Sequence, residues 1–100
     1  MFVALERLIN LQEGYRKTFQ VSGQQLLLLV VDNQPLLIEN RCPHQGAPLH
    51  SATLEGNVLR CQRHGIEFRL PCGQPVQQAA CTSLKVFSLA YEGDRIGIDV

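Results

Sequence analysis

Two short Cys–His fragments constrain this chain more than any other feature of its sequence. Cys42-Pro43-His44 and Cys61-Gln62-Arg63-His64 are separated by 16 residues. Within each fragment the cysteine and the histidine are close enough for both side chains to bind one metal centre. Thiolate and imidazole are both competent ligands of iron and of zinc. The fold therefore has to place two loops side by side around a single site.

The segment that contains these fragments differs in composition from the rest of the chain. Residues 41–75 hold four of the five prolines, four of the eight glycines, all three histidines and three of the four cysteines. Such a composition predicts loops, with short strands near 57–61 and 66–70. Loops held on a rigid base are where binding sites usually lie.

Outside this segment the sequence predicts antiparallel β-hairpins. Residues 15–21 alternate apolar and polar side chains, residues 24–31 form a continuous apolar run that suits a strand covered on both faces, and residues 35–40 follow a turn at 32–34. Alternating residues 87–91 and 96–100 flank a turn at 92–94. No window longer than about two turns keeps a helical period; one short turn is expected around Leu5, Leu8 and Ile9.

Composition bounds the class of protein. One hundred residues with 45% apolar and 18% charged side chains indicate a single folded domain, residues 1–100. Nine basic residues balance nine acidic ones, so the charge pattern of a nucleic-acid-binding protein is missing. The longest apolar run, Leu26 to Val31, is far too short for a membrane span, and no signal-peptide pattern is present. We therefore expect a cytoplasmic monomer with reduced thiols.

Spacing alone leaves two metal sites open. Two thiolates and two imidazoles could form a closed tetrahedral zinc site. The same four side chains could hold a Rieske [2Fe–2S] cluster, with both cysteines on one iron and both histidines on the other.

The flanking residues distinguish the two. Segments 42–49, CPHQGAPL, and 61–68, CQRHGIEF, resemble the Rieske family in its small ferredoxin branch. The consensus motifs of that family are close to C-P-H-x-G-x-x-L and C-x-x-H-G-x-x-F. In this resemblance Gly46 and Gly65 allow close approach to the inorganic sulfides and are expected to adopt unusual dihedrals, and Leu49 and Phe68 are expected to pack beneath the loops.

The resemblance implies an all-β fold, an antiparallel β-sandwich or small barrel base with inserted cluster-binding loops at about 41–75. It implies one [2Fe–2S] cluster held by Cys42, His44, Cys61 and His64. Such a chain would be an electron-transfer protein and not an enzyme. It would pass electrons from a flavin-dependent ferredoxin reductase to the terminal oxygenase of a ring-hydroxylating dioxygenase. The alternatives are a small or accessory subunit of a nitrite-reductase-type enzyme and, in a different class, a zinc-binding interaction module.

The resemblance also indicates a low reduction potential. High-potential family members carry an extra disulfide between the loops, but Ala47 and Arg63 occupy those positions here. They also place hydroxyl donors where this chain has Ile66 and Phe68. Donors to sulfur stabilise the reduced state, so their loss predicts a potential near the lower end of the Rieske range.

Several other residues have ordinary interpretations. His50 is expected to be a surface residue, and Cys72 and Cys81 are expected to be reduced thiols. Residues 77–80 stand where family members usually have a proline that shields the cluster. The arginines beside the ligands are candidates for a basic rim that docks an acidic partner, or else are ordinary solvated side chains.

Overall fold

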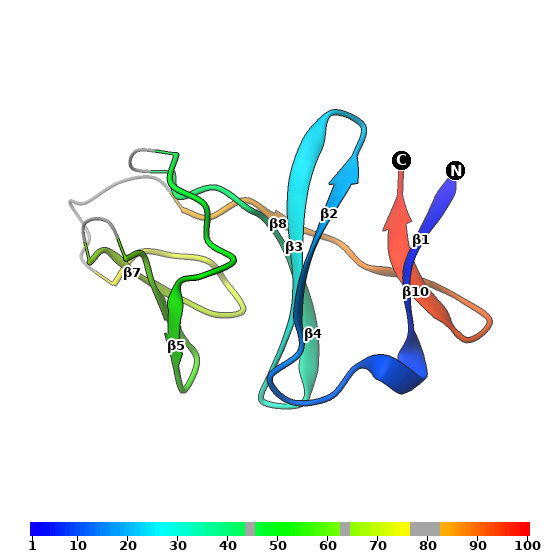
Figure 1. The fold of residues 1–100 in the computed structure, drawn as a ribbon, viewed down its shortest axis with the longest axis horizontal. Coiled ribbons are helices and arrows are strands. Elements are labelled where there is room, and N and C mark those ends of the chain that lie inside the picture. The colour runs from blue at the N-terminus through cyan, green and yellow to red at the C-terminus, as the bar shows by residue number, and fades with distance from the viewer. Residues whose placement is uncertain (44–45, 63–64, 77–82) are drawn as a thin grey trace.

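The computed structural model describes residues 1–43, 46–62, 65–76 and 83–100. Within these ranges the chain forms ten β-strands and one 3-10 turn, arranged in three antiparallel sheets, with no α-helix. The all-β prediction is confirmed. No helix in the described ranges has the length and hydropathy needed to cross a bilayer. The sheets follow one another along the longest axis of the molecule, which measures 41 Å (Figure 1).

The central sheet contains the strands that the sequence predicted best. It consists of β2 (Arg16–Val21), β3 (Gln24–Val31), β4 (Gln34–Glu39) and β8 (Val86–Phe87), in the order β2-β3-β4-β8. The turn between β3 and β4 places Asp32 at φ 55° and Asn33 at φ 61°. Two successive positive φ values are typical of the tight hairpin turn that matches strand twist, and asparagine and aspartate tolerate them.

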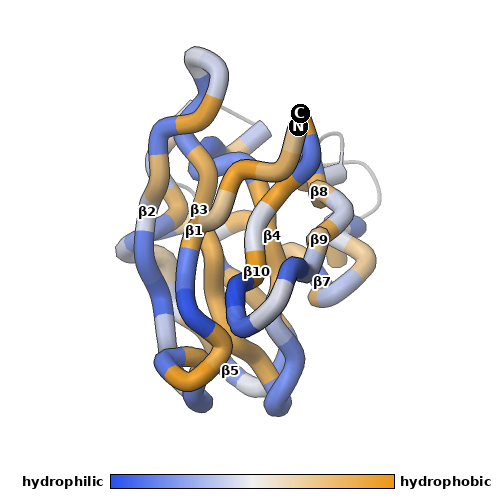
Figure 2. Tube along the Cα trace, turned by 90° about the vertical axis from the view of Figure 1, so that its right-hand side faces the viewer, coloured by the Kyte–Doolittle hydropathy of each residue, from blue (hydrophilic) through white to orange (hydrophobic). Residues whose placement is uncertain are grey.

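Strand β3 separates two hydrophobic cores. Leu27, Leu29 and Val31 belong to the core beneath the Cys–His loops, whereas Leu26 and Leu28 belong to the core on the other face. Successive side chains of a strand point to opposite faces. A continuous apolar run is therefore what a strand between two cores requires. Figure 2 shows the hydrophobic colour concentrated along β3 and β4.

The terminal sheet consists of β1 (Phe2–Arg7), β10 (Arg95–Asp99) and β9 (Ala90–Glu92), in the order β1-β10-β9. The Met1 ammonium donates to the Val100 carbonyl oxygen at 2.7 Å, so the two termini lie together at this end (Figure 1). The expected short turn is a 3-10 turn at Leu8–Asn10, but Leu5 lies in β1 instead.

The alternating residues 87–91 do not form one strand. Strand β8 pairs with β4 in the central sheet, and β9 pairs with β10 in the terminal sheet. The chain crosses from one sheet to the other at residues 88–89. Alternation alone does not show which neighbour a strand pairs with.

The third sheet lies at the opposite end from the termini (Figure 1). It consists of β5 (Thr53–Glu55), β6 (Val58–Arg60) and β7 (Glu67–Arg69), in the order β5-β6-β7. Their inward side chains, Leu54, Leu59 and Phe68, pack into or against the core that β3 shares with this end. The Cys–His loops belong to this end of the molecule.

Candidate metal centre

The two predicted cysteine ligands lie in one core. Cys42 follows β4 at the start of the first loop, and Cys61 follows β6 at the start of the second. Each is 1% exposed, and both belong to the hydrophobic core that includes Leu49, Leu59 and Phe68. Residues 19 positions apart in the sequence thus share one buried core.

The two loops are closed by the same pair of backbone hydrogen bonds. In each loop the cysteine N–H donates to the carbonyl of the residue five positions later. The glycine four positions after the cysteine donates back to the cysteine carbonyl. These distances are 2.7 and 2.7 Å in the first loop (Cys42, Gly46, Ala47) and 2.9 and 2.8 Å in the second (Cys61, Gly65, Ile66). The two loops therefore have the same hydrogen-bond pattern, although their Cys–His spacings differ by one residue.

The closing glycines need the left-handed backbone region. Gly46 has φ +74° and Gly65 has φ +69°, values that residues with a Cβ adopt at a cost. An arginine also occupies the space beside each glycine. A Cβ on Gly46 would lie 3.2 Å from Nε of Arg41, and a Cβ on Gly65 would lie 3.1 Å from Nη2 of Arg60. The expectation that both glycines adopt unusual dihedrals is confirmed.

Leu49 and Phe68 pack beneath the two loops. Both side chains are 0% exposed and lie in one core with Leu27 and Leu29 of β3. This placement confirms the predicted packing. It also means that the central sheet supports both loops directly.

Asn40 holds the end of the first loop, near Leu49. It is 5% exposed and is the buried polar residue of the described chain. Its Oδ1 accepts the Leu49 N–H at 2.7 Å, and its Nδ2 donates to Gln25 Oε1 at 3.2 Å and lies 3.2 Å from His50 Nδ1. Because Oδ1 is committed to Leu49, the amide is oriented with Nδ2 toward His50.

Arg16 of β2 also holds the segment that follows the first loop. Its Nη1 donates to the carbonyl oxygens of His50 at 3.1 Å and of Ala52 at 2.6 Å. Sequence reasoning missed both anchors. A polar residue that follows an apolar strand and stands two positions before Cys42 was an available signal for Asn40, whereas nothing local distinguishes Arg16 from other strand arginines.

The remaining predicted residues divide into two groups. His50 and Cys72 are exposed, and Cys72 is an unbridged thiol, as expected. His44, His64, Cys81 and residues 77–80 lie outside the described residues, so the histidine ligands stay predictions. Two buried thiols on loops closed alike are soft donors that fit an iron–sulfur cluster.

Comparisons with known proteins agree with this chemistry. The family model of the Rieske [2Fe-2S] domain matches residues 2–88. The ferredoxin CarAc of Metapseudomonas resinovorans is 31% identical over 80% of this chain and 76% of its own length. The chain belongs to the Rieske [2Fe–2S] domain family. One [2Fe–2S] cluster is therefore its cofactor, which decides against zinc.

Some relatives are much longer than this chain. The iron–sulfur subunit TsaM1 of the toluene-4-sulfonate monooxygenase system of Comamonas testosteroni is 43% identical over 51% of this chain. That match spans only 15% of TsaM1.

Solved structures match the whole fold. The Sphingomonas yanoikuyae B1 ferredoxin has a TM-score of 0.85 at 21% identity, covering 100% of this chain and 99% of its own. A chain from a complex of reduced oxygenase and oxidised ferredoxin in carbazole 1,9a-dioxygenase has a TM-score of 0.80 at 25% identity, covering 94% and 97%. A putative small subunit of an NADPH nitrite reductase has a TM-score of 0.75 at 17% identity, covering 100% and 99%.

Proposed function

We propose that this chain is a one-electron carrier in a ring-hydroxylating dioxygenase system, where it takes electrons from a flavin-dependent ferredoxin reductase and delivers them to a terminal oxygenase. The bound cluster supplies a site that accepts and releases one electron. Cys42 and Cys61 would provide thiolate ligands from buried positions, and His44 and His64 would provide imidazole ligands. The observation that carries the proposal is the pair of buried cysteines on loops closed alike over one core.

The dioxygenase context comes from the relatives. CarAc is a ferredoxin, and the biphenyl 2,3-dioxygenase ferredoxin component of Rhodococcus jostii is 25% identical over 91% of this chain and 85% of its own length. A nitrite-reductase-type role is the second candidate, because the putative small subunit shares the fold across its whole length. Electron delivery to a purified ring-hydroxylating oxygenase, against delivery to a nitrite reductase, separates the two.

We further propose a low reduction potential. Phe68 is fully buried beneath the loops, and the carbonyl oxygen of Ile66 accepts the Cys61 N–H at 2.9 Å. Neither side chain has a hydroxyl to donate to sulfur. The midpoint potential should therefore lie near the lower end of the range of about −150 to +300 mV for Rieske centres. A midpoint above zero would contradict this.

Substitution of the ligands tests the assignment. Cys42→Ser, His44→Ala, Cys61→Ser and His64→Ala should each abolish the visible absorption and the EPR signal of the reduced cluster in anaerobically prepared protein. Cys72→Ser and His50→Gln are matched controls, because both side chains are exposed, and both variants should keep two irons per chain. Full cluster content in any of the four ligand variants would overturn the ligand set.

We also propose that residues 1–100 act as one monomeric, cytoplasmic domain with the cluster-binding lobe at about 41–75. The unbridged, exposed thiol of Cys72 supports a reducing compartment. Light scattering on the holoprotein tests the monomer.

A further inference from the structure

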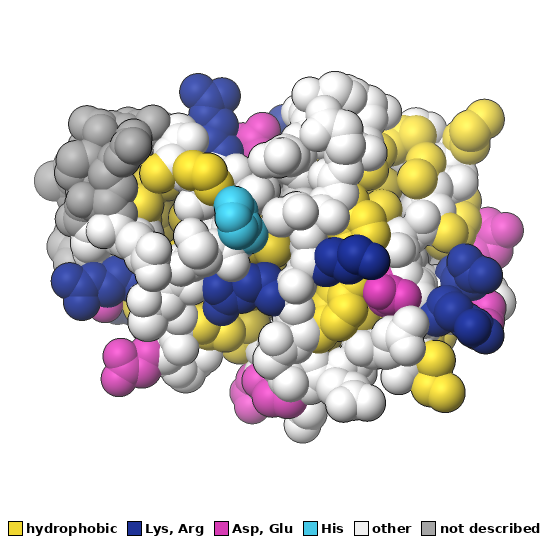
Figure 3. All heavy atoms as spheres, in the orientation of Figure 1, with side chains coloured by type: hydrophobic (Ala, Val, Ile, Leu, Met, Phe, Trp, Pro, Cys, Tyr) yellow, Lys and Arg dark blue, Asp and Glu magenta, His cyan; other side chains and the backbone are white. Residues whose placement is uncertain are grey.

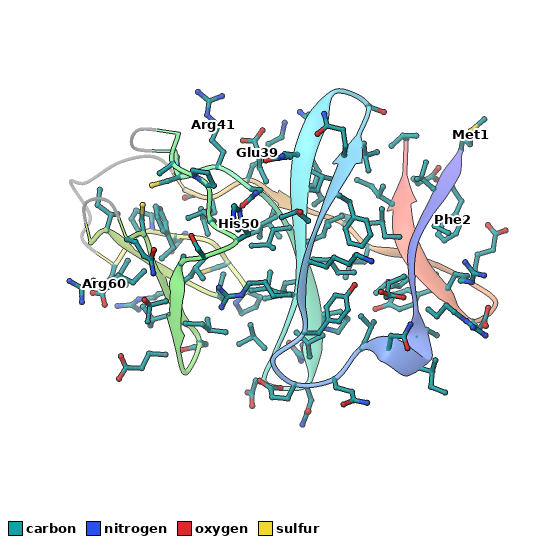
Figure 4. The ribbon with its side chains drawn as sticks, in the orientation of Figure 1. Met1, Phe2, Glu39, Arg41, His50 and Arg60 are labelled. Atoms are coloured by element: carbon teal, nitrogen blue, oxygen red, sulfur yellow. The ribbon has the colours of Figure 1, made fainter. Side chains whose placement is uncertain are left out.

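We propose that Arg41 and Arg60 form a docking surface for the acidic face of a redox protein. The two side chains stand at the margins of the end that carries the third sheet, Arg41 at the top and Arg60 at the left of Figure 4. Figure 3 shows basic side chains at the same two places on the molecular surface. This surface presupposes the electron-transfer function proposed above and specifies the charge of the partner.

The two arginines have equivalent positions in the two loops. Each directly precedes a cysteine ligand, and each places its guanidinium beside the glycine that closes the loop. Both side chains are nevertheless exposed. Each of these two cations thus lies next to a cysteine that is proposed to bind the cluster.

Neither guanidinium is neutralised by a close carboxylate. In the described part of the chain no carboxylate oxygen lies within 4.0 Å of Arg41 or Arg60, although Glu67 is opposite Arg60 in the β6–β7 register. Glu39 precedes Arg41 by two residues in the sequence. At the other end of the molecule, by contrast, Arg7 and Arg95 lie 3.7 and 3.6 Å from the carboxylate of Asp94.

Charge is distributed unevenly along the chain. Segment 41–76 has four arginines against two glutamates, which leaves it two positive charges. The rest of the chain has five basic residues against seven acidic ones, which leaves two negative charges. A molecule of zero net charge therefore has a positive cluster-binding end. Such asymmetry orients an approaching partner and raises the rate of productive encounter.

This arrangement fits a partner with carboxylates around its own redox centre. Exposed charges act over about 10 Å at 0.1 M ionic strength, so attraction between the two faces should weaken as salt is added. A partner with a basic face should instead be repelled by this end.

Cytochrome c provides matched probes of opposite charge. Native cytochrome c presents lysines around its haem edge, and its succinylated form presents carboxylates there, whereas the electron acceptor is the same. The reduced holoprotein gives one electron from its cluster to the ferric haem of either form. Binding at low ionic strength is measured by calorimetry, and electron transfer is measured by stopped flow.

The test variant is Arg41→Gln/Arg60→Gln, and the control is Arg7→Gln/Arg95→Gln, which changes net charge equally at the other end. For the wild type we expect binding and reduction of the succinylated form to weaken with salt. The test variant should lower both by roughly three- to tenfold at low ionic strength. The control should stay within about twofold of the wild type, and native cytochrome c should show the reverse salt dependence.

Equal losses in both variants, or no loss in the test variant, would overturn the docking surface. If the wild type reduces both forms without regard to salt, the electron-transfer function stands and the docking surface falls. If the purified protein holds no redox-active cluster by EPR, the proposed function fails and this surface fails with it.

Discussion

At the scale of single residues, Glu6 shows how one carboxylate can tie two segments together. Its Oε1 accepts the Asn10 Nδ2–H at 2.9 Å and the Arg7 N–H at 2.8 Å, and its Oε2 accepts the Tyr15 O–H at 2.7 Å. These bonds, with that from Asn10 the largest cause and that from Tyr15 next, lower the pKa of Glu6 from 4.5 to about 2. Burial, followed by the bond to Glu6, raises the pKa of Tyr15.

This depressed pKa predicts a pH dependence of stability. Because the folded pKa lies below the unfolded one, the contribution is fully present above about pH 4.5 and is lost as the pH falls toward 2. Urea unfolding of the wild type should therefore show a steeper loss of stability across that interval than Glu6→Gln. Glu92→Gln, at an exposed carboxylate of β9, should retain the wild-type slope. Parallel curves for wild type and Glu6→Gln would contradict the prediction.

At the scale of elements, the pairing of β1 with β10 depends on a close approach at Gly97. An added Cβ there would lie close to the Val3 backbone, at 2.9 Å from its carbonyl carbon. The register of the two strands shifts nearby, between Ala4 and Glu6. A side chain at position 97 can be accommodated only if β1 moves away.

Gly97→Ala should therefore destabilise the fold by about 1–3 kcal/mol, the usual cost of overpacking. Ala4→Ser changes the exposed residue opposite Gly97 and should stay within about 0.5 kcal/mol of the wild type. Chemical denaturation measures both, and amide exchange should locate the loss in β1 and β10. If Gly97→Ala leaves the free energy of unfolding unchanged, then β1 and β10 are not held this close.

Strands with a strong local sequence pattern were predictable, whereas the neighbour with which a strand pairs was not. The apolar run of β3 and the turns on either side of it fixed the central hairpins within one residue. The Cys–His motifs picked out Cys42 and Cys61, which the structure places in one buried core. The three-residue strand β5 and the division of residues 87–91 between two sheets were missed, because three residues carry little periodicity and alternation does not specify a neighbour. Asn40 and Arg16 act through long-range contacts that no local pattern encodes.

At the scale of the whole molecule, the side chains of Arg16 and Asn40 join the central sheet to the cluster-binding lobe. Arg16 reaches across to the carbonyls of His50 and Ala52, and Asn40 binds the Leu49 N–H. These contacts hold the chain where the first loop returns toward β5. They determine how firmly the lobe is held against its base.

Arg16→Gln should lower the free energy of unfolding by about 1–2 kcal/mol, since it removes hydrogen bonds from a charged donor. It should also speed amide exchange around Ala52 and shorten the lifetime of the cluster, measured as loss of visible absorption. Lys17→Gln, at the adjacent exposed position of β2, is the control with the same change in charge. Equal cluster lifetimes in the two variants would show that Arg16 does not secure the lobe.

The meeting of the termini has a consequence for how such a domain can be combined with others. The Met1 ammonium and the Val100 carbonyl oxygen are 2.7 Å apart, at the end away from the Cys–His loops. A unit whose ends coincide can be inserted into a surface loop of a host protein without being stretched. In such a chimaera the attachment point and the proposed electron-transfer face would lie at opposite poles, so a tether would leave that face accessible.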